Sequence, residues 1–106
     1  LRVGGRSGDG VRFGMTVKKT FTIKNELGLH ARAAGRPVEV ANRYRSVIRL
    51  ERDGRQADGR SLLDILTLAC PRGARVVIRA EGDDAREAVD EMGKLIEERF
   101  GEEQDS

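Results

Sequence analysis

Two kinds of apolar periodicity alternate along this chain, and their order constrains the fold more than any other feature. Runs with an apolar residue at every second position, the period of a half-buried strand, lie at 16–24, 46–52, 55–58 and 76–80. Stretches with apolar residues every three or four positions, the period of an amphipathic helix, lie at 31–44, 62–69 and 85–100. The order β-α-β-β-α-β-α predicts an α+β open-faced sandwich, a four-stranded antiparallel sheet with three helices on one face.

Local residues mark several ends of these elements. Asp53-Gly54 tolerates positive φ and predicts a two-residue type I′ hairpin. Asp83 or Asp84 is expected to cap the last helix. Pro71 and Gly73 end the short helix before them.

Pro37 conflicts with the first helix. A proline inside a helix removes a backbone hydrogen bond and clashes with the preceding turn, at a cost of about 3 kcal/mol. We therefore expect a helix that is kinked near Ala33 and Ala34, or one that begins later with Pro37 in its first turn.

The length of 106 residues allows one small domain. Residues 1–14 hold five of the thirteen glycines without an apolar period, which predicts a flexible leader. We attribute that leader to an extension of the reading frame rather than to a functional arm. Residues 15–100 are expected to form the folded domain, and 101–106 an acidic tail that frays.

Composition excludes several classes of protein. The longest apolar run, 65–70, is far shorter than the ~20 residues of a membrane span. No secretory signal is recognisable and Cys70 is the single cysteine, so we expect a cytoplasmic, reduced protein, and a monomer. A net charge of +2 and 4% aromatic residues argue against a nucleic-acid partner. Because His30 and Cys70 are the only soft ligands, no metal or cofactor is expected.

His30, the only histidine, directly precedes the first predicted helix. Free N–H groups at a helix start bind anions, and Arg32 adds a charged donor. A neutral imidazole nitrogen at this place can attack a phosphoryl group and hold it as a phosphoramidate. A surface or capping histidine is the simpler interpretation, and position alone leaves both open.

The segment Gly28-Leu29-His30-Ala31-Arg32-Ala33-Ala34 resembles the active-site motif of the HPr family, the histidine-containing phosphocarriers of the bacterial phosphoenolpyruvate:sugar phosphotransferase system. Three further segments fall at the spacings of the family, namely Asp53-Gly54-Arg55, Arg60-Ser61-Leu62-Leu63 and Ala80-Glu81-Gly82-Asp83-Asp84. The resemblance covers about residues 15–100. It implies an HPr-like fold and a protein that accepts and donates a phosphoryl group without turning over a substrate of its own.

The resemblance also implies roles for single residues. His30 would receive the phosphoryl group on Nδ1 from phospho-enzyme I and pass it to an enzyme IIA component, in sugar uptake or nitrogen-type regulation. Arg32 would help to neutralise the phosphate. Ser61 matches a serine that an HPr kinase/phosphorylase phosphorylates in some lineages, although a plain helix N-cap explains the residue equally well.

Leu63 lies off the apolar stripe of its helix and is expected to be exposed. The stripe itself consists of Leu62, Ile65, Leu66 and Ala69. The family places an apolar contact at the position of Leu63. With Leu62 it would form an apolar spot that suits acidic partners, rimmed by Arg32, Arg36 and Arg60.

Two residues depart from the family pattern. Ala33 stands where the family usually has proline, and Pro37 where a large apolar residue is common. Because both changes affect the helix start that would cradle the phosphate, a non-carrier regulatory protein of the same fold remains an alternative. An RNA-binding domain is disfavoured by the few aromatic residues, and a small hydrolase by the lack of a paired acid and base.

Overall fold

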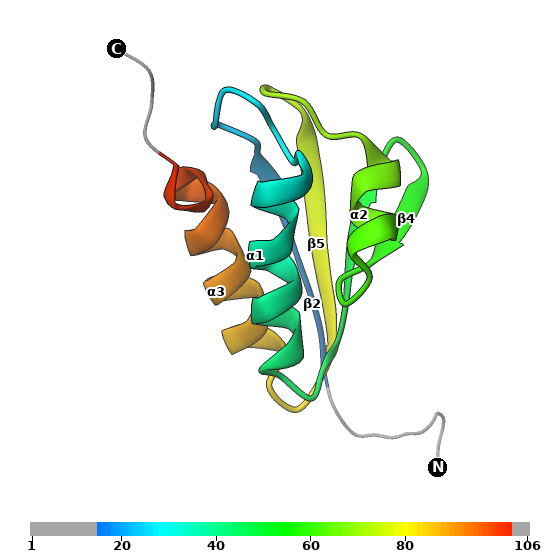
Figure 1. Ribbon diagram of the computed structural model, residues 1–106. Coiled ribbons are helices and arrows are strands. Elements are labelled where there is room, and N and C mark those ends of the chain that lie inside the picture. Colours follow the sequence, from blue (N-terminus) through cyan, green and yellow to red (C-terminus); the bar gives the residue numbers. More distant parts are fainter. Residues whose placement is uncertain (1–14, 103–106) are drawn as a thin grey trace.

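The computed structural model describes residues 15–102, so the predicted leader at 1–14 and residues 103–106 of the predicted tail lie outside the described residues. Figure 1 shows the elements in chain order, which are β2 (Met15–Thr22), α1 (Ala31–Asn42), β3 (Val47–Arg52), β4 (Arg55–Asp58), α2 (Leu62–Leu68), β5 (Arg75–Gly82), α3 (Ala85–Glu97) and the 3₁₀ turn η1 (Arg99–Gly101). This order matches the predicted one.

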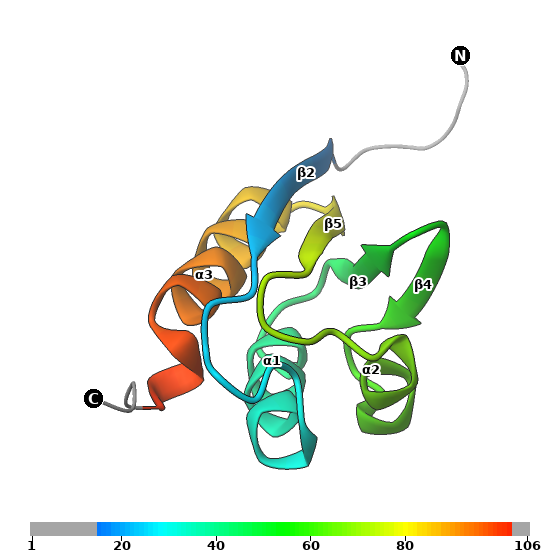
Figure 2. The same ribbon diagram turned by 90° about the horizontal axis from the view of Figure 1, so that it is seen from above.

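The four strands form one antiparallel sheet in the order β2-β5-β3-β4. All three α-helices cover the same face of this sheet, and the opposite face is open (Figure 2). The predicted open-faced sandwich is therefore confirmed. Asp53 and Gly54 both have positive φ, 52° and 78°, as the predicted hairpin between β3 and β4 requires.

The core lies between the sheet and the helices. Every second residue of the central strands points into it, namely Ile48, Leu50, Val76, Ile78 and Ala80, each 3% exposed or less. From the helices, α3 contributes Ala85, Ala88, Val89, Met92 and Ile96, and α1 contributes Ala33, Ala34, Pro37, Val40 and Ala41. Small residues predominate among the buried residues of α1, which packs against α2 and α3.

The first helix differs from the expectation raised by Pro37. α1 begins at Ala31 and is uninterrupted at Ala33 and Ala34, so the later start is wrong. Pro37 is fully buried, and its ring fills the core position that a larger apolar residue would take. Tertiary packing therefore outweighs the poor intrinsic helix propensity of this stretch.

The second helix is shorter than predicted, and its buried face is shifted. Ile65 and Leu68 are buried, whereas Leu62 is 42% exposed. Ala69 takes a left-handed conformation (φ 55°) and ends the helix with its side chain exposed. The predicted stripe is thus wrong at Leu62 and Ala69, because a helix of seven residues buries less than two full turns.

The last helix ends at Glu97, earlier than predicted. Phe100 belongs instead to the left-handed turn η1, although it is buried as expected, with 2% exposed. Asp84 stands at the N-cap position of α3, but its side chain makes no capping hydrogen bond.

Asp84 instead joins two loops at one end of the molecule. Its carboxylate accepts hydrogen bonds from the backbone N–H groups of Arg45 and Ser46, each 2.9 Å long, and from the Ser46 hydroxyl. The bond from the Ser46 hydroxyl, with the backbone bonds, holds the pKa of Asp84 below its ordinary value, although burial works in the opposite direction. The ionised carboxylate thus ties the α1–β3 loop to the start of α3.

We predict that Asp84→Asn lowers the free energy of unfolding by about 1–2 kcal/mol at neutral pH, because hydrogen bonds to a charged acceptor are lost. A carboxyl whose pKa is lowered by folding stabilises the protein above its unfolded pKa, near 4, and loses this effect as the pH falls through the folded pKa. The difference between the two proteins should therefore shrink below about pH 4. Urea denaturation at several pH values measures it, with Asp83→Asn, a change in an exposed neighbour, as control. A difference that stays constant with pH contradicts the role of the charge.

We predict that Pro37→Ala raises the free energy of unfolding by about 1 kcal/mol. The restored hydrogen bond and relieved clash contribute about 3 kcal/mol, and the lost apolar burial removes about 1–2 kcal/mol of this gain. Gly35→Ala is the matched control, because a Cβ there meets nothing within 4 Å and should stabilise the helix by about 1 kcal/mol. A loss of stability in Pro37→Ala alone would show that the buried ring contributes more than the helix bond.

Candidate functional site

The loop before α1 is held by the loop before β5. Ile23 donates its N–H to the carbonyl of Ala74 (2.9 Å), and Leu29 donates to the carbonyl of Cys70 (2.8 Å). Gly28 has φ +67°, and a Cβ on it would lie 2.3 Å from the Cys70 carbonyl oxygen, so only glycine fits this close approach. The two loops together fix the position of the next residue, His30.

His30 occupies the N-cap position of α1 with an extended backbone (φ −78°, ψ 177°). Its carbonyl accepts the first helical hydrogen bond from Ala34 (2.8 Å), but its side chain makes no capping bond. The interpretation of His30 as a side-chain cap is therefore wrong. The N–H groups of Ala31, Arg32 and Ala33 have no acceptor within the helix and point toward its N-terminal end. This end of α1 has the donors and the dipole that attract an anion.

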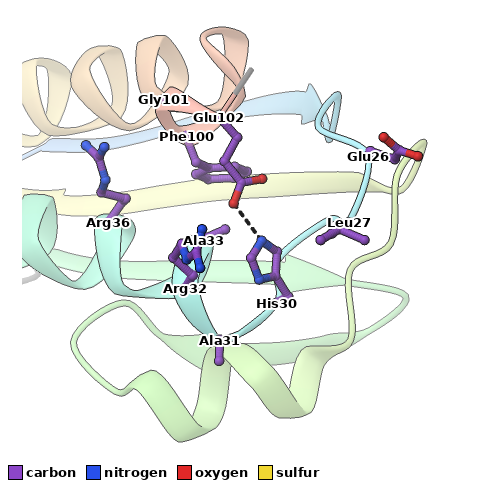
Figure 3. Close-up of a pocket in the computed structure, with 10 residues that line it drawn as sticks. All are labelled: Glu26, Leu27, His30, Ala31, Arg32, Ala33, Arg36, Phe100, Gly101 and Glu102. Carbon is purple, nitrogen blue, oxygen red and sulfur yellow. Dashed lines mark hydrogen bonds and ion pairs between the residues drawn. The ribbon is translucent and has the colours of Figure 1, made fainter. Parts of the chain in front are cut away.

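The imidazole of His30 is bound by a carboxylate from the far end of the chain (Figure 3). Nε2 of His30 lies 2.7 Å from Oε2 of Glu102. The other carboxylate oxygen, Oε1, accepts a hydrogen bond from Nδ2 of Asn25 (2.9 Å), which also donates to the carbonyl of Gly28 (2.8 Å). Asn25 is 1% exposed, so these three residues form a partly buried chain of hydrogen bonds.

Glu102 is ionised at neutral pH. Burial alone would raise its pKa, but the hydrogen bonds from Asn25 and His30, and the charges of His30 and Arg32, hold the pKa below its ordinary value. An ionised carboxylate only accepts hydrogen bonds, which assigns the proton of the bond to Nε2 of His30. In a neutral imidazole, Nδ1 then carries the lone pair.

Two residues of this site, Asn25 and Glu102, are not among those that the sequence predicts. Glu102 falls in the tail that is expected to fray, whereas its carboxylate is hydrogen-bonded to two other residues. No signal in the sequence places Glu102 at the site, because Phe100, whose burial holds the following residues there, falls within the helix predicted at 85–100.

His30 and Glu102 line an open pocket of about 780 Å³. Arg32 and Arg36 line it from α1, and Phe100 and Gly101 from the chain end (Figure 3). The guanidinium of Arg36 lies against Gly101, since a Cβ on this glycine would come within 2.7 Å of its Nη2. The structure thus brings together His30, Arg32 and Arg36.

Arg60 is not part of this group. It donates hydrogen bonds to the carbonyls of Ala41 (3.3 Å) and Tyr44 (2.6 Å), beside the C-terminal end of α1. His30 precedes the other end of this twelve-residue helix, about 18 Å away along its axis. The predicted rim of arginines is therefore an extended strip rather than a compact spot.

Leu62 and Leu63 lie near the Arg60 end of this strip. Leu63 is 73% exposed, as its off-stripe position predicts, and Leu62 is 42% exposed. Ser61, directly before them, caps α2, because its hydroxyl accepts a hydrogen bond from the Asp64 N–H (3.1 Å). The N-cap interpretation of Ser61 is therefore confirmed.

Within residues 15–102, no cluster of three or more His, Cys, Asp or Glu residues has the arrangement of a metal site. None of the helices described has the length and apolar character needed to cross a membrane.

The known proteins to which this chain is similar belong to one family. Residues 17–98 match the family described as "PTS HPr component phosphorylation site". The chain is 38% identical over 86 residues to the phosphocarrier protein HPr of Cupriavidus necator, which covers 81% of this chain and 97% of the relative. It is 40% identical over 83 residues to HPr of Pseudomonas aeruginosa, with 77% and 92% covered. The crystal structure of HPr-C-His from Thermoanaerobacter tengcongensis superposes with a TM-score of 0.79 at 40% identity, and 82% of this chain and 98% of that chain are covered.

Proposed function

The chain belongs to the HPr family of phosphotransferase-system phosphocarriers, and from this premise we propose that His30 accepts a phosphoryl group from phospho-enzyme I and passes it to an enzyme IIA component. The cytoplasm, where such partners meet, is its proposed location. The acceptor atom is Nδ1 of His30.

The hydrogen bonding of the His30 imidazole is the observation on which this proposal rests. Its Nε2 is occupied by Glu102, while the imidazole makes no bond to the helix start it precedes. Nδ1 is thus the nitrogen left for attack on phosphorus. The unpaired N–H groups of the first turn and the charge of Arg32 would meet the phosphoryl oxygens.

The regular start of α1 removes the main reason for the alternative, a non-carrier protein of the same fold. That alternative assumed that Pro37 distorts the first turn. The helix begins at Ala31, six residues before Pro37, and the bond from Ala34 N–H to the His30 carbonyl is formed. The regular first turn ahead of the proline therefore supports anion binding by its N–H groups.

For partner binding we propose the surface strip of Arg32, Arg36 and Arg60 together with Leu62 and Leu63. It combines exposed leucine side chains with exposed arginines of α1, which suits transient contact with acidic surfaces. Ser61 lies beside it, so phosphorylation of Ser61 by a kinase would place negative charge in this strip.

The proposed function predicts that His30→Ala abolishes labelling of the chain by phosphoenolpyruvate and enzyme I. The label on the unchanged protein should be stoichiometric, labile in acid and stable in alkali. Circular dichroism serves as the control, because the side chain of His30 is partly exposed and lies outside the buried core. Label that persists in His30→Ala would assign the phosphoryl group to another residue.

We further predict that Ser61→Asp slows phosphoryl transfer from enzyme I about fivefold at low salt, as about 1 kcal/mol of repulsion between like charges would do. Stability should be unchanged or slightly higher, because aspartate is also a good N-cap. Ser61→Asn keeps the cap without the charge and should transfer at the normal rate. Equal rates for both variants would remove Ser61 and its neighbours from the docking surface.

A further inference from the structure

We propose that Glu102, held by Asn25, is a positioning residue that keeps the proton of the His30 imidazole on Nε2 and so leaves Nδ1 as the nucleophile. This inference rests on the proposed function, in which Nδ1 accepts the phosphoryl group. It adds a residue from beyond the last helix to the site.

The hydrogen bonds around Glu102 determine which way each group points. Asn25 uses its amide nitrogen for both of its bonds, to the carbonyl of Gly28 and to Oε1 of Glu102. Both acceptors are oxygens, so the amide of Asn25 cannot turn its own oxygen toward them. With Oε1 fixed in this way, Oε2 of Glu102 faces Nε2 of His30 at 2.7 Å.

The chain reaches this position through an unusual turn. Arg99, Phe100 and Gly101 have φ values of 58°, 55° and 78°, three left-handed residues in succession, of which two are not glycine. This conformation is unfavourable for side chains with a Cβ and persists only where its surroundings impose it. The burial of Phe100, with 2% exposed, and the two hydrogen bonds of Glu102 supply that constraint. A tail that merely frayed would not adopt such a turn.

Figure 3 shows how Glu102 and His30 lie relative to each other in the pocket. The carboxylate of Glu102 lies over one edge of the imidazole of His30, while the second ring nitrogen faces the start of α1. The side chain of Glu102 is 24% exposed and that of His30 28% exposed, so the bond between them is partly shielded from water.

In the transfer step, the lone pair on Nδ1 of His30 forms a bond to phosphorus. The bond between phosphorus and the leaving atom of the phosphorylated donor breaks, and its electron pair stays with the donor. The proton on Nε2 remains in place, so the ring becomes cationic, and the carboxylate of Glu102 neutralises this charge. Arg32 and the helix N–H groups meet the charge on the phosphoryl oxygens. Glu102 touches only the ring edge remote from phosphorus.

Glu102→Gln tests directly whether Glu102 determines which ring nitrogen of His30 carries the proton. Asn25 still needs an acceptor, so the oxygen of the new amide should face Asn25 and its NH₂ group should face Nε2 of His30. Nε2 then has to accept, and the proton moves to Nδ1. Two-dimensional NMR of the ring nitrogens, at a pH where the imidazole is neutral, shows which nitrogen is protonated. We expect protonated Nε2 in the unchanged protein and protonated Nδ1 in Glu102→Gln.

The rate of phosphoryl acceptance is the second readout. We expect Glu102→Gln to slow it roughly tenfold or more, since an imidazole in the wrong tautomer is a poor nucleophile. Glu102→Ala removes the acceptor at Nε2 but places no donor there, so either tautomer can form. The rate of phosphoryl acceptance should then fall less, about threefold. Glu98→Gln is the matched control, because it removes the same charge from an exposed residue at the end of α3 and should leave rate and tautomer unchanged.

The outcomes separate this inference from the proposed function. An unchanged protein that takes no label on His30 refutes the proposed function, whatever the tautomer is. Normal labelling with protonated Nε2 in Glu102→Gln refutes the role of Glu102. If Glu102→Gln does not fold, the rate of phosphoryl acceptance by Glu102→Ala decides. A rate equal to that of the unchanged protein would show that the carboxylate has no positioning role, and a faster rate would show that it obstructs the site.

Discussion

The site depends on the backbone hydrogen bonds that join the loop before α1 to the loop before β5. Ile23 bonds to Ala74 in this region, Gly73 bonds to Ile23, and Leu29 bonds to Cys70, all at 2.8–2.9 Å. These bonds continue the pairing of β2 with β5 beyond the end of the sheet and deliver His30 to the first turn of α1. Because β5 is a central strand and the loop that follows β2 is hydrogen-bonded to the loop before β5, the position of the imidazole is fixed by the core.

Much of this arrangement could be predicted from local patterns. The alternation at Val76, Ile78 and Ala80 gives the central strand, and Asp53-Gly54 gives its neighbouring hairpin, because period and turn chemistry act over a few residues. His30 was found for the same reason, since the start of a helix is a local feature. The family resemblance then added the identity of the chemistry, which periodicity alone did not provide.

What could not be predicted depends on contacts between distant residues. Asp84 has the sequence signature of an N-cap. Its carboxylate instead accepts hydrogen bonds from the N–H groups of Arg45 and Ser46, which belong to a loop distant in the sequence. Pro37 opposes a helix locally, yet its ring is fully buried in the packed core. Glu102 lies 72 residues from His30 in the chain, and no local pattern shows that a buried Phe100 brings them together.

The charges around His30 also bear on the direction of transfer. A carrier has to accept a phosphoryl group and then release it, so the phosphorylated state cannot be stabilised much more than the free one. Arg32 and the start of α1 favour the phosphoryl group, while the carboxylate of Glu102 attracts the cationic ring but repels the phosphoryl oxygens. Glu102 contacts the edge of the ring remote from Nδ1. Its carboxylate is therefore closer to the cationic ring, which it attracts, than to the phosphoryl oxygens, which it repels. In the proposed function, the carboxylate would therefore favour acceptance overall, and the opposing repulsion would limit how tightly the phosphoryl group is held.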